Sequence, residues 1–175
     1  MSETITIRRA LFSRDKVHRL RLDRTVRIEG PFEPKRVVFI GVNPSLADDV
    51  DDDHTVRKLA GFCLRWGYSD FTVVNVFSRV ATQVKELSKP GLVAMSPRAR
   101  DHFVQACTEA DLIVPMWGSR NKLPQSLHSD VDWTLAFLRE HYWKKVEVFG
   151  MTESGDPMHP LMLSYATPLR PWGLK

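Results

Sequence analysis

The chain has 175 residues, a formal net charge of +4 at pH 7 and 43% hydrophobic residues. This length supports one folded domain with one core, and the composition excludes disordered, collagen-like and membrane-spanning chains. Two cysteines, Cys63 and Cys107, are too few for a disulfide framework or for a zinc or iron–sulfur site built from thiolates alone. We interpret both as buried reduced thiols. The amino terminus lacks the apolar run of a signal peptide, which predicts a cytoplasmic location.

Residues 1–35 are predicted to form a basic antiparallel β extension, joined to an α/β core of residues 36–175 within a single domain, 1–175. The stretches ITIRRALF and HRLRLDRTVRI alternate apolar and polar residues at period two, which is typical of half-exposed antiparallel strands. Their many arginines form either a solvated hairpin or a basic face for a polyanionic partner.

From Arg36 onward the pattern changes to four short apolar runs, which are VVFIGV, FTVVNVF, DLIVPMW and KVEVFG. Helical stretches separate these runs, so we expect an α/β fold in which a four-stranded parallel sheet is covered on both faces. The expected helix ends are Asp53 or Thr55 with Gly67 for the first helix, Ser96 and Pro97 for the second, and Asp130 with Tyr142 for the third.

The segments that follow the four strands carry the informative residues. In such a sheet the loops after the strands meet at one edge, where ligands bind near a topological switch point. These segments run over residues 41–45, 75–79, 117–119 and 150–160. The sequence therefore predicts a ligand site at this edge.

Three polar residues in these segments are candidates for that site. Asn43, in the turn GVNPS, either only shapes the turn or presents its carboxamide to a pocket. Asn75 interrupts an apolar strand, and an unsatisfied buried amide is costly, so it faces either a polar pocket or a neighbouring loop. His159 precedes Pro160, whose ring stiffens the backbone and can fix the direction of the imidazole.

An acidic run of residues 48–53, followed by His54, raises the question of a metal site. An EF-hand register starting at Asp48 fails, because its sixth position is Asp53 and its twelfth is Leu59. We therefore favour a solvated helix start, stabilised by the helix dipole, over a metal site. The histidines show no metal-binding spacing and no common nucleotide motif is present, so we expect neither metal nor cofactor.

Two series of sequence blocks resemble known families. The blocks NPSLAD, DDDHTVRKLAGFCLRWGY, VVNVFSRVAT, WGS and HPLML resemble an uncharacterised bacterial and phage domain family over most of the chain. More distantly, the order VVFIGVNPS, VVNVF, VPMWGSRNK and HPLMLS is similar to the uracil-DNA glycosylase superfamily. The second resemblance implies a three-layer α/β/α sandwich and a base flipped out of a nucleic-acid strand.

The glycosylase resemblance also implies roles for individual residues. Asn43 and His159 would be catalytic, the first orienting a water and the second stabilising negative charge on the leaving base. Asn75 would contact the base edge, Phe62 or Phe77 would stack on the base, and Leu163 would enter the gap in the duplex. The implied substrate-binding residues are Gly41, Pro44, Ser45, Phe62, Asn75, Phe77, Trp117, Gly118 and Leu163. By position alone, Phe77 and Trp117 are more typical of core residues.

Two departures qualify the expected reaction. A carboxamide at Asn43 cannot act as a general base, which predicts a slow enzyme, and the small Ser45 admits bases larger than uracil. The function expected is hydrolysis of an N-glycosidic bond in DNA or a nucleotide, with no membrane partner. Two alternatives stay open: a non-catalytic module that binds nucleic acid or a modified base, and a metal-dependent nucleotide or phosphoester hydrolase that uses the run from Asp48 to Asp53.

Overall fold

The computed structural model describes residues 4–45 and 47–173. Its strands are β1 (Ile5–Phe12), β2 (Arg19–Val26), β3 (Arg36–Gly41), β4 (Asp70–Asn75), β5 (Leu112–Pro115), β6 (Glu147–Val148) and β7 (Arg170–Pro171). Its α-helices are α1 (His54–Trp66), α2 (Pro97–Glu109) and α3 (His128–His141). None of the helices in this described part is long and apolar enough to cross a membrane.

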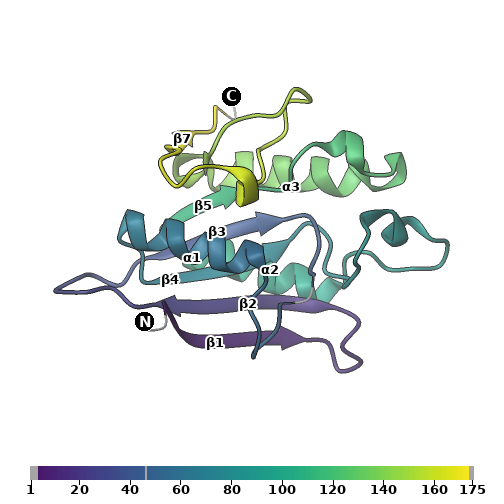
Figure 1. Ribbon diagram of the computed structural model, residues 1–175. Helices are drawn as coiled ribbons and strands as arrows, with labels where there is room; N and C mark the ends of the chain where they lie inside the picture. The colour runs from purple at the N-terminus through teal and green to yellow at the C-terminus, as the bar shows by residue number, and fades with distance from the viewer. Residues whose placement is uncertain (1–3, 46, 174–175) are drawn as a thin grey trace.

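Five strands form one mixed sheet in the order β1-β2-β4-β3-β5 (Figure 1). The amino-terminal hairpin of β1 and β2 continues this sheet, because β2 pairs antiparallel with β4. The strands β4 and β5 lie on opposite sides of β3 and are both parallel to it. The chain therefore reverses its winding direction at β3, and this produces the switch point at which α/β proteins bind ligands.

The parallel part of the sheet has three strands rather than the expected four. The fourth apolar run meets β5 only at an isolated bridge between Ile113 and Val146. Immediately afterwards β6 pairs with β7, and the amide of Trp172 donates to the carbonyl of Val146. The fourth apolar run therefore pairs with the carboxy-terminal segment in a separate two-stranded sheet and does not extend the parallel sheet as a fourth strand.

The helices cover both faces of the sheet because successive side chains of the buried strands point to opposite sides. On one face, Phe39 and Phe71 pack with Leu59 and Phe62 of α1, which lies in front of the sheet in Figure 1. On the other face, Val38, Ile40, Val74 and Ile113 pack with apolar residues of α2 and α3. Both cysteines are free and buried, one in each of these clusters.

The caps of the first two helices confirm the predicted ends. Asp53 accepts a hydrogen bond from the amide of Val56, at 2.8 Å, and Gly67 ends α1 with a φ of 73°. Ser96 caps α2 before Pro97. The third helix differs from the prediction, since it begins at His128, continuing a 3-10 turn, so that Asp130 lies in its first turn.

The acidic run is packed against the amino-terminal hairpin instead of being fully solvated. The carboxylate of Asp52 lies between Arg8 Nε, at 2.8 Å, and Arg24 Nε, at 2.6 Å. The Arg24 side chain is completely buried and also donates to the carbonyl of Asp48. Asp49 and Asp51 are exposed, as the sequence predicted for the whole run. The buried ion pair therefore fixes the loop that leads into α1.

Asp52→Ala should lower the free energy of unfolding by about 3–5 kcal/mol, because it leaves the buried Arg24 charged and without its counter-ion. Asp49→Ala, at an exposed site in the same run, should change it by less than about 0.5 kcal/mol. Urea denaturation of both variants measures the difference. Equal losses would show that the ion pair does not anchor the loop.

Candidate functional site

A cavity of about 220 Å³ opens at the carboxyl ends of β3 and β4. Its polar lining includes Arg19, Asn43, Ser45, Asp53, Asn75 and His159. Gly41 also contributes to the wall. Segments far apart in the sequence therefore meet at the switch point. They bring together the three polar candidates Asn43, Asn75 and His159.

The carboxamide of Asn43 has a fixed orientation. Its Nδ2 donates to the carbonyl oxygens of Pro44, at 3.0 Å, and Ala81, at 2.7 Å. Both partners can only accept, so the atom that faces them is the amide nitrogen. Asn43 thus shapes the turn and also leaves its Oδ1 without a hydrogen-bond partner among the described residues. This oxygen can accept a bond from a water or a ligand.

Asn75 ends β4 directly beside Gly41 of β3. Its Oδ1 accepts a hydrogen bond from Arg19 Nη2, at 3.3 Å. An arginine has donors only, so this bond leaves the Nδ2 donors of Asn75 for another partner. A Cβ atom at Gly41 would lie 2.8 Å from that Nδ2, so a side chain at this position would displace the Asn75 amide.

His159 begins the 3-10 turn Pro160–Met162, and its Nδ1 accepts a hydrogen bond from the amide of Leu161, at 3.3 Å. The neutral ring therefore carries its proton on Nε2 and is a donor there. Desolvation lowers the pKa of His159 below its usual value, Lys122 lowers it further, and the carboxylate of Asp53 opposes both effects. The imidazole is consequently neutral at physiological pH.

The loop before His159 is held by a buried carboxylate. Asp156 is 1% exposed and accepts hydrogen bonds from Arg120, through its amide and its Nε, and from Ser154 Oγ. The amide of Gly118 donates to the carbonyl of Pro157, at 2.9 Å, and Gly118 adopts a φ of 76° next to the His159 side chain. The Trp-Gly turn after β5 thus supports the histidine loop without lining the cavity.

The sequence did not single out two of the charged residues that line the cavity. Arg19 is 5% exposed, and its Nη1 donates to the carbonyl of Ala47, at 2.9 Å. Burial lowers the pKa of Arg19 to about 10, although Asp53 opposes this effect. Asp53 was expected as a helix cap or as part of a metal-binding acidic run, not as a wall of this cavity, and its second oxygen accepts a bond from Ser45 Oγ. The alternating pattern of β2 had placed Arg19 on a half-exposed face.

The three predicted aromatic residues lie in the core. Phe62 contacts the rings of Trp66, Phe149 and Tyr165 and is fully buried. Phe77 and Trp117 belong to the cluster on the opposite face of the sheet, in agreement with their interpretation as core residues. None of the three lines the cavity.

Two further predicted contacts also lie outside the cavity lining. Pro44 is buried, and Leu163 packs partly buried against the α1 side of the core. Met162, one residue before Leu163, is 90% exposed. Met162 is thus the most exposed apolar side chain of this loop, ahead of Leu161 at 40%.

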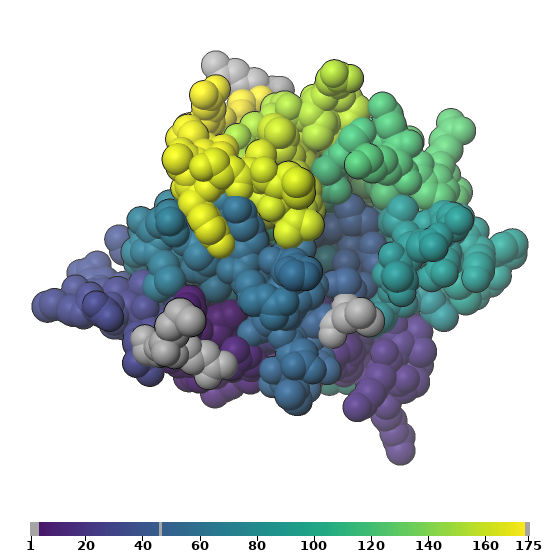
Figure 2. Space-filling model, in the orientation of Figure 1, coloured from purple at the N-terminus to yellow at the C-terminus, as the bar shows by residue number. Residues whose placement is uncertain are grey.

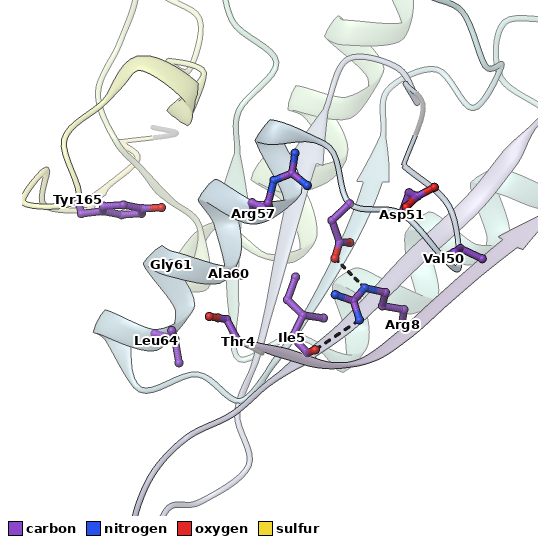
Figure 3. Close-up of a pocket in the computed structure, with 11 residues that line it drawn as sticks. Thr4, Ile5, Arg8, Val50, Asp51, Arg57, Ala60, Gly61, Leu64 and Tyr165 are labelled. Carbon is purple, nitrogen blue, oxygen red and sulfur yellow. Dashed lines mark hydrogen bonds and ion pairs between the residues drawn. The ribbon is translucent and has the colours of Figure 1, made fainter. Parts of the chain in front are cut away.

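A larger groove, of about 570 Å³, lies between β1, α1 and Tyr165 (Figure 3). Its Arg8 is bonded to Asp52, so this charge is already compensated (Figure 3). Lys58 and Arg65 lie over the ring of Tyr165, at 3.9 and 4.3 Å from its centre. The groove therefore lies beside a basic surface of α1, and its own lining includes Arg57 and the exposed carboxylate of Asp51.

The carboxy-terminal segment lies directly against α1 in the space-filling view (Figure 2). A Cβ atom at Gly61 would lie 2.5 Å from Tyr165 Oη, so the absence of a side chain at this helix position allows the contact. The segment that carries His159 and Met162 is thereby fixed at both ends, by Asp156 and by Tyr165.

The acidic run shows no arrangement suited to a metal ion. Asp52 is bonded to two arginines, Asp48 accepts from the amides of Val50 and Asp51, and Asp53 caps α1. Across residues 4–45 and 47–173, no group of three or more acidic, histidine or cysteine residues is placed to hold a metal ion. The metal-dependent alternative therefore finds no ligand set in this part of the chain.

The pKa of His159 should respond to its two charged neighbours in opposite directions. An NMR titration of the imidazole should give a midpoint below 6.5. Asp53→Asn should move it further down, because the opposing carboxylate is lost, and Lys122→Gln should move it up. Because the folded pKa is the lower one, protonating His159 reduces stability as the pH falls below 6.5. A midpoint insensitive to both substitutions would contradict this arrangement.

Comparison with known proteins gives a family. Residues 19–161 match the model of a family described as protein of unknown function, DUF1643. No curated protein and no solved structure matches the chain. The matched region contains Arg19, Asn43, Asp53, Asn75 and His159. The match confirms the resemblance to an uncharacterised domain family, and the chain belongs to DUF1643.

Proposed function

We propose that the protein hydrolyses an N-glycosidic bond of a nucleobase in a nucleic-acid strand or a nucleotide, on a sandwich of the uracil-DNA glycosylase type. One observation carries this proposal. An acceptor, Asn43 Oδ1, a carboxylate, Asp53, and the donors of Asn75 and His159 line one cavity at the ends of parallel strands. Such a set can bind a water on one side and a leaving base on the other.

Hydrolysis needs an activated water molecule, and we assign its activation to Asp53 in the cavity wall. A water that donates hydrogen bonds to Asn43 Oδ1 and to the carboxylate of Asp53 attacks C1′ of the sugar while the bond from C1′ to the base nitrogen breaks. The electron pair of that bond leaves with the base, Asp53 takes a proton from the water, and this proton passes to the departing base. Asp53 thus supplies the basic group that the carboxamide of Asn43 cannot.

The departing base must be stabilised as it gains negative charge. His159 Nε2 and Asn75 Nδ2 are fixed as donors before any ligand binds, and preoriented donors stabilise developing charge without reorganisation. The cavity, at about 220 Å³, lies below the roughly 300–1,000 Å³ typical of drug-sized ligand pockets. Its size suits a single base rather than a whole dinucleotide.

The surface beside the cavity suits a polyanionic strand. The helix α1 lines both hollows, with Val56 and Leu59 in the cavity and Arg57 in the larger groove. Lys58 and Arg65 add positive charge along the same helix. A strand whose phosphates follow this groove would present one base to the cavity.

A module that binds a modified base without cleaving it is the second candidate function. It is favoured because the carboxamide of Asn43 cannot take a proton from water and both oxygens of Asp53 already accept hydrogen bonds, from Val56 and Ser45. This candidate predicts saturable binding of the base in the same cavity without release of free base.

The two candidates separate in a cleavage assay. Single- and double-stranded oligonucleotides bearing uracil, mismatched thymine or modified pyrimidines are incubated with the protein, and alkali-labile abasic sites are scored. Asp53→Asn should retain the helix cap and the fold, because asparagine caps as well as aspartate, while the rate falls about 100-fold or more. His159→Ala should lower the rate at nearly unchanged stability. Binding without cleavage by folded wild-type protein would favour the second candidate.

Binding of a single strand should weaken as salt increases, because phosphate contacts release counter-ions. Arg57→Gln and Arg65→Gln should each lower the slope of log Kd against log salt by about 1. Arg139→Gln, on the exposed surface of α3, is the matched control and should leave the slope unchanged. A flat salt response of the wild-type protein would argue against a polyanionic strand.

A further inference from the structure

The strand β2 carries two buried arginines, and only one of them forms an ion pair with a carboxylate of the described residues. Arg24 is 1% exposed and has the Asp52 carboxylate at 2.6 Å. Arg19 is 5% exposed, and no carboxylate of the described residues lies within ion-pair distance of it. A buried charge is normally paired, because desolvation without a counter-ion is costly. Arg19 therefore lacks the partner that its burial calls for.

The hydrogen bonds of Arg19 are also incomplete. Its Nη1 and Nη2 donate to the carbonyl of Ala47 and to Asn75 Oδ1, and its Nε has no acceptor among the described residues. An orphaned donor on a buried charged group carries its full desolvation cost. Nε itself has almost no accessible surface, but Arg19 lines the cavity, so a negatively charged ligand there can supply the missing counter-ion.

Asp53 lines the same cavity but does not take this place. Its two oxygens accept bonds from the amide of Val56 and from Ser45 Oγ. It acts on Arg19 only through the longer-range electrostatic interaction that opposes the effect of burial. Arg19 and Asn75 therefore form a wall of donors, while Asp53 and Asn43 offer acceptors.

We propose that the cavity is an oxyanion site, in which a negatively charged oxygen of the ligand binds beside Arg19 and the Nδ2 donors of Asn75. The guanidinium presents several donors in one plane, which suits carboxylate and phosphate oxygens. The inference rests on the proposed function in taking this cavity as the ligand site. It narrows the ligand to a nucleotide that presents a phosphate or to a base that carries an acidic oxygen.

Thermal unfolding tests the site with simple probes. Sodium phosphate and sodium acetate, compared with sodium chloride at equal ionic strength, should raise the Tm of the wild-type protein by about 3 °C at saturation. A larger effect of phosphate identifies a nucleotide phosphate as the source, and a larger effect of acetate identifies a carboxylated base. Equal effects of all three salts, or no effect, would overturn the proposal.

Substitutions locate the effect. Arg19→Gln should abolish the difference between the oxyanions and chloride, and Arg19→Lys should retain part of it because the charge stays. Arg27→Gln removes the same charge from an exposed position outside the cavity lining and should leave the difference intact. Loss of the effect in Arg27→Gln to the same extent would show a nonspecific charge effect and overturn the assignment to Arg19.

Asn75→Asp gives an independent test that does not depend on tolerance of a change at Arg19. It places a carboxylate at the position of an amide oxygen 3.3 Å from Arg19 Nη2. The Tm without added oxyanion should rise, because Arg19 gains a counter-ion, and the oxyanion effect should disappear. A lower Tm together with an unchanged oxyanion effect would overturn the proposal.

The oligonucleotide assay separates this inference from the proposed function. Oxyanion stabilisation that depends on Arg19, in a protein that cleaves none of the oligonucleotides, would support the oxyanion site and overturn the glycosidic hydrolysis. Cleavage that persists in Arg19→Gln, without any oxyanion effect in the wild-type protein, would support the glycosidic hydrolysis and overturn the oxyanion site.

Discussion

The buried carboxylate of Asp52, held between Arg8 and Arg24, is the contact on which the arrangement of the cavity depends. It joins the amino-terminal hairpin to the loop before α1, two segments that share no regular pairing. With that loop fixed, Asp53 begins α1 next to Ser45, and the carbonyl of Ala47 meets Arg19. Of the acidic run, only Asp53 lines the cavity. The run thus contributes mainly by fixing the position of the loop before α1.

The cavity combines groups that are fixed before a ligand arrives. Asn43 is held by two carbonyl oxygens, Asn75 by Arg19, and His159 by the backbone of its own turn. Each of these bonds engages one polar atom of the side chain and leaves the other for a ligand. The remaining atom is an acceptor in Asn43 and a donor in Asn75 and His159. The buried Arg19 fits the same pattern, because a negatively charged ligand in the cavity would be the counter-ion that the described part of the protein does not supply.

Strand periodicity and turn chemistry predicted much of this from the sequence alone. They placed Asn43, Asn75 and His159 after strands, and the structure brings all three to one edge. Arg19 could not be predicted, because alternation in β2 suggests one exposed face, whereas β2 lies inside the sheet between β1 and β4 with α1 and α2 packed over it. The absence of a fourth strand from the parallel sheet could not be predicted either, since the pairing of β6 with β7 depends on a distant carboxy-terminal segment.

Side-chain NMR of the Asp53→Asn variant, which is expected to bind without cleaving, tests most directly whether this cavity is the ligand site. A single-stranded oligonucleotide containing uracil is titrated while the Nε–H of Arg19 and Arg8 and the side-chain amide of Asn75 are followed. The account predicts saturable shifts of Arg19 and Asn75, with Arg8 much less affected because Asp52 already holds it. Shifts confined to Arg8 and the groove beside α1, with Arg19 and Asn75 unchanged, would contradict it.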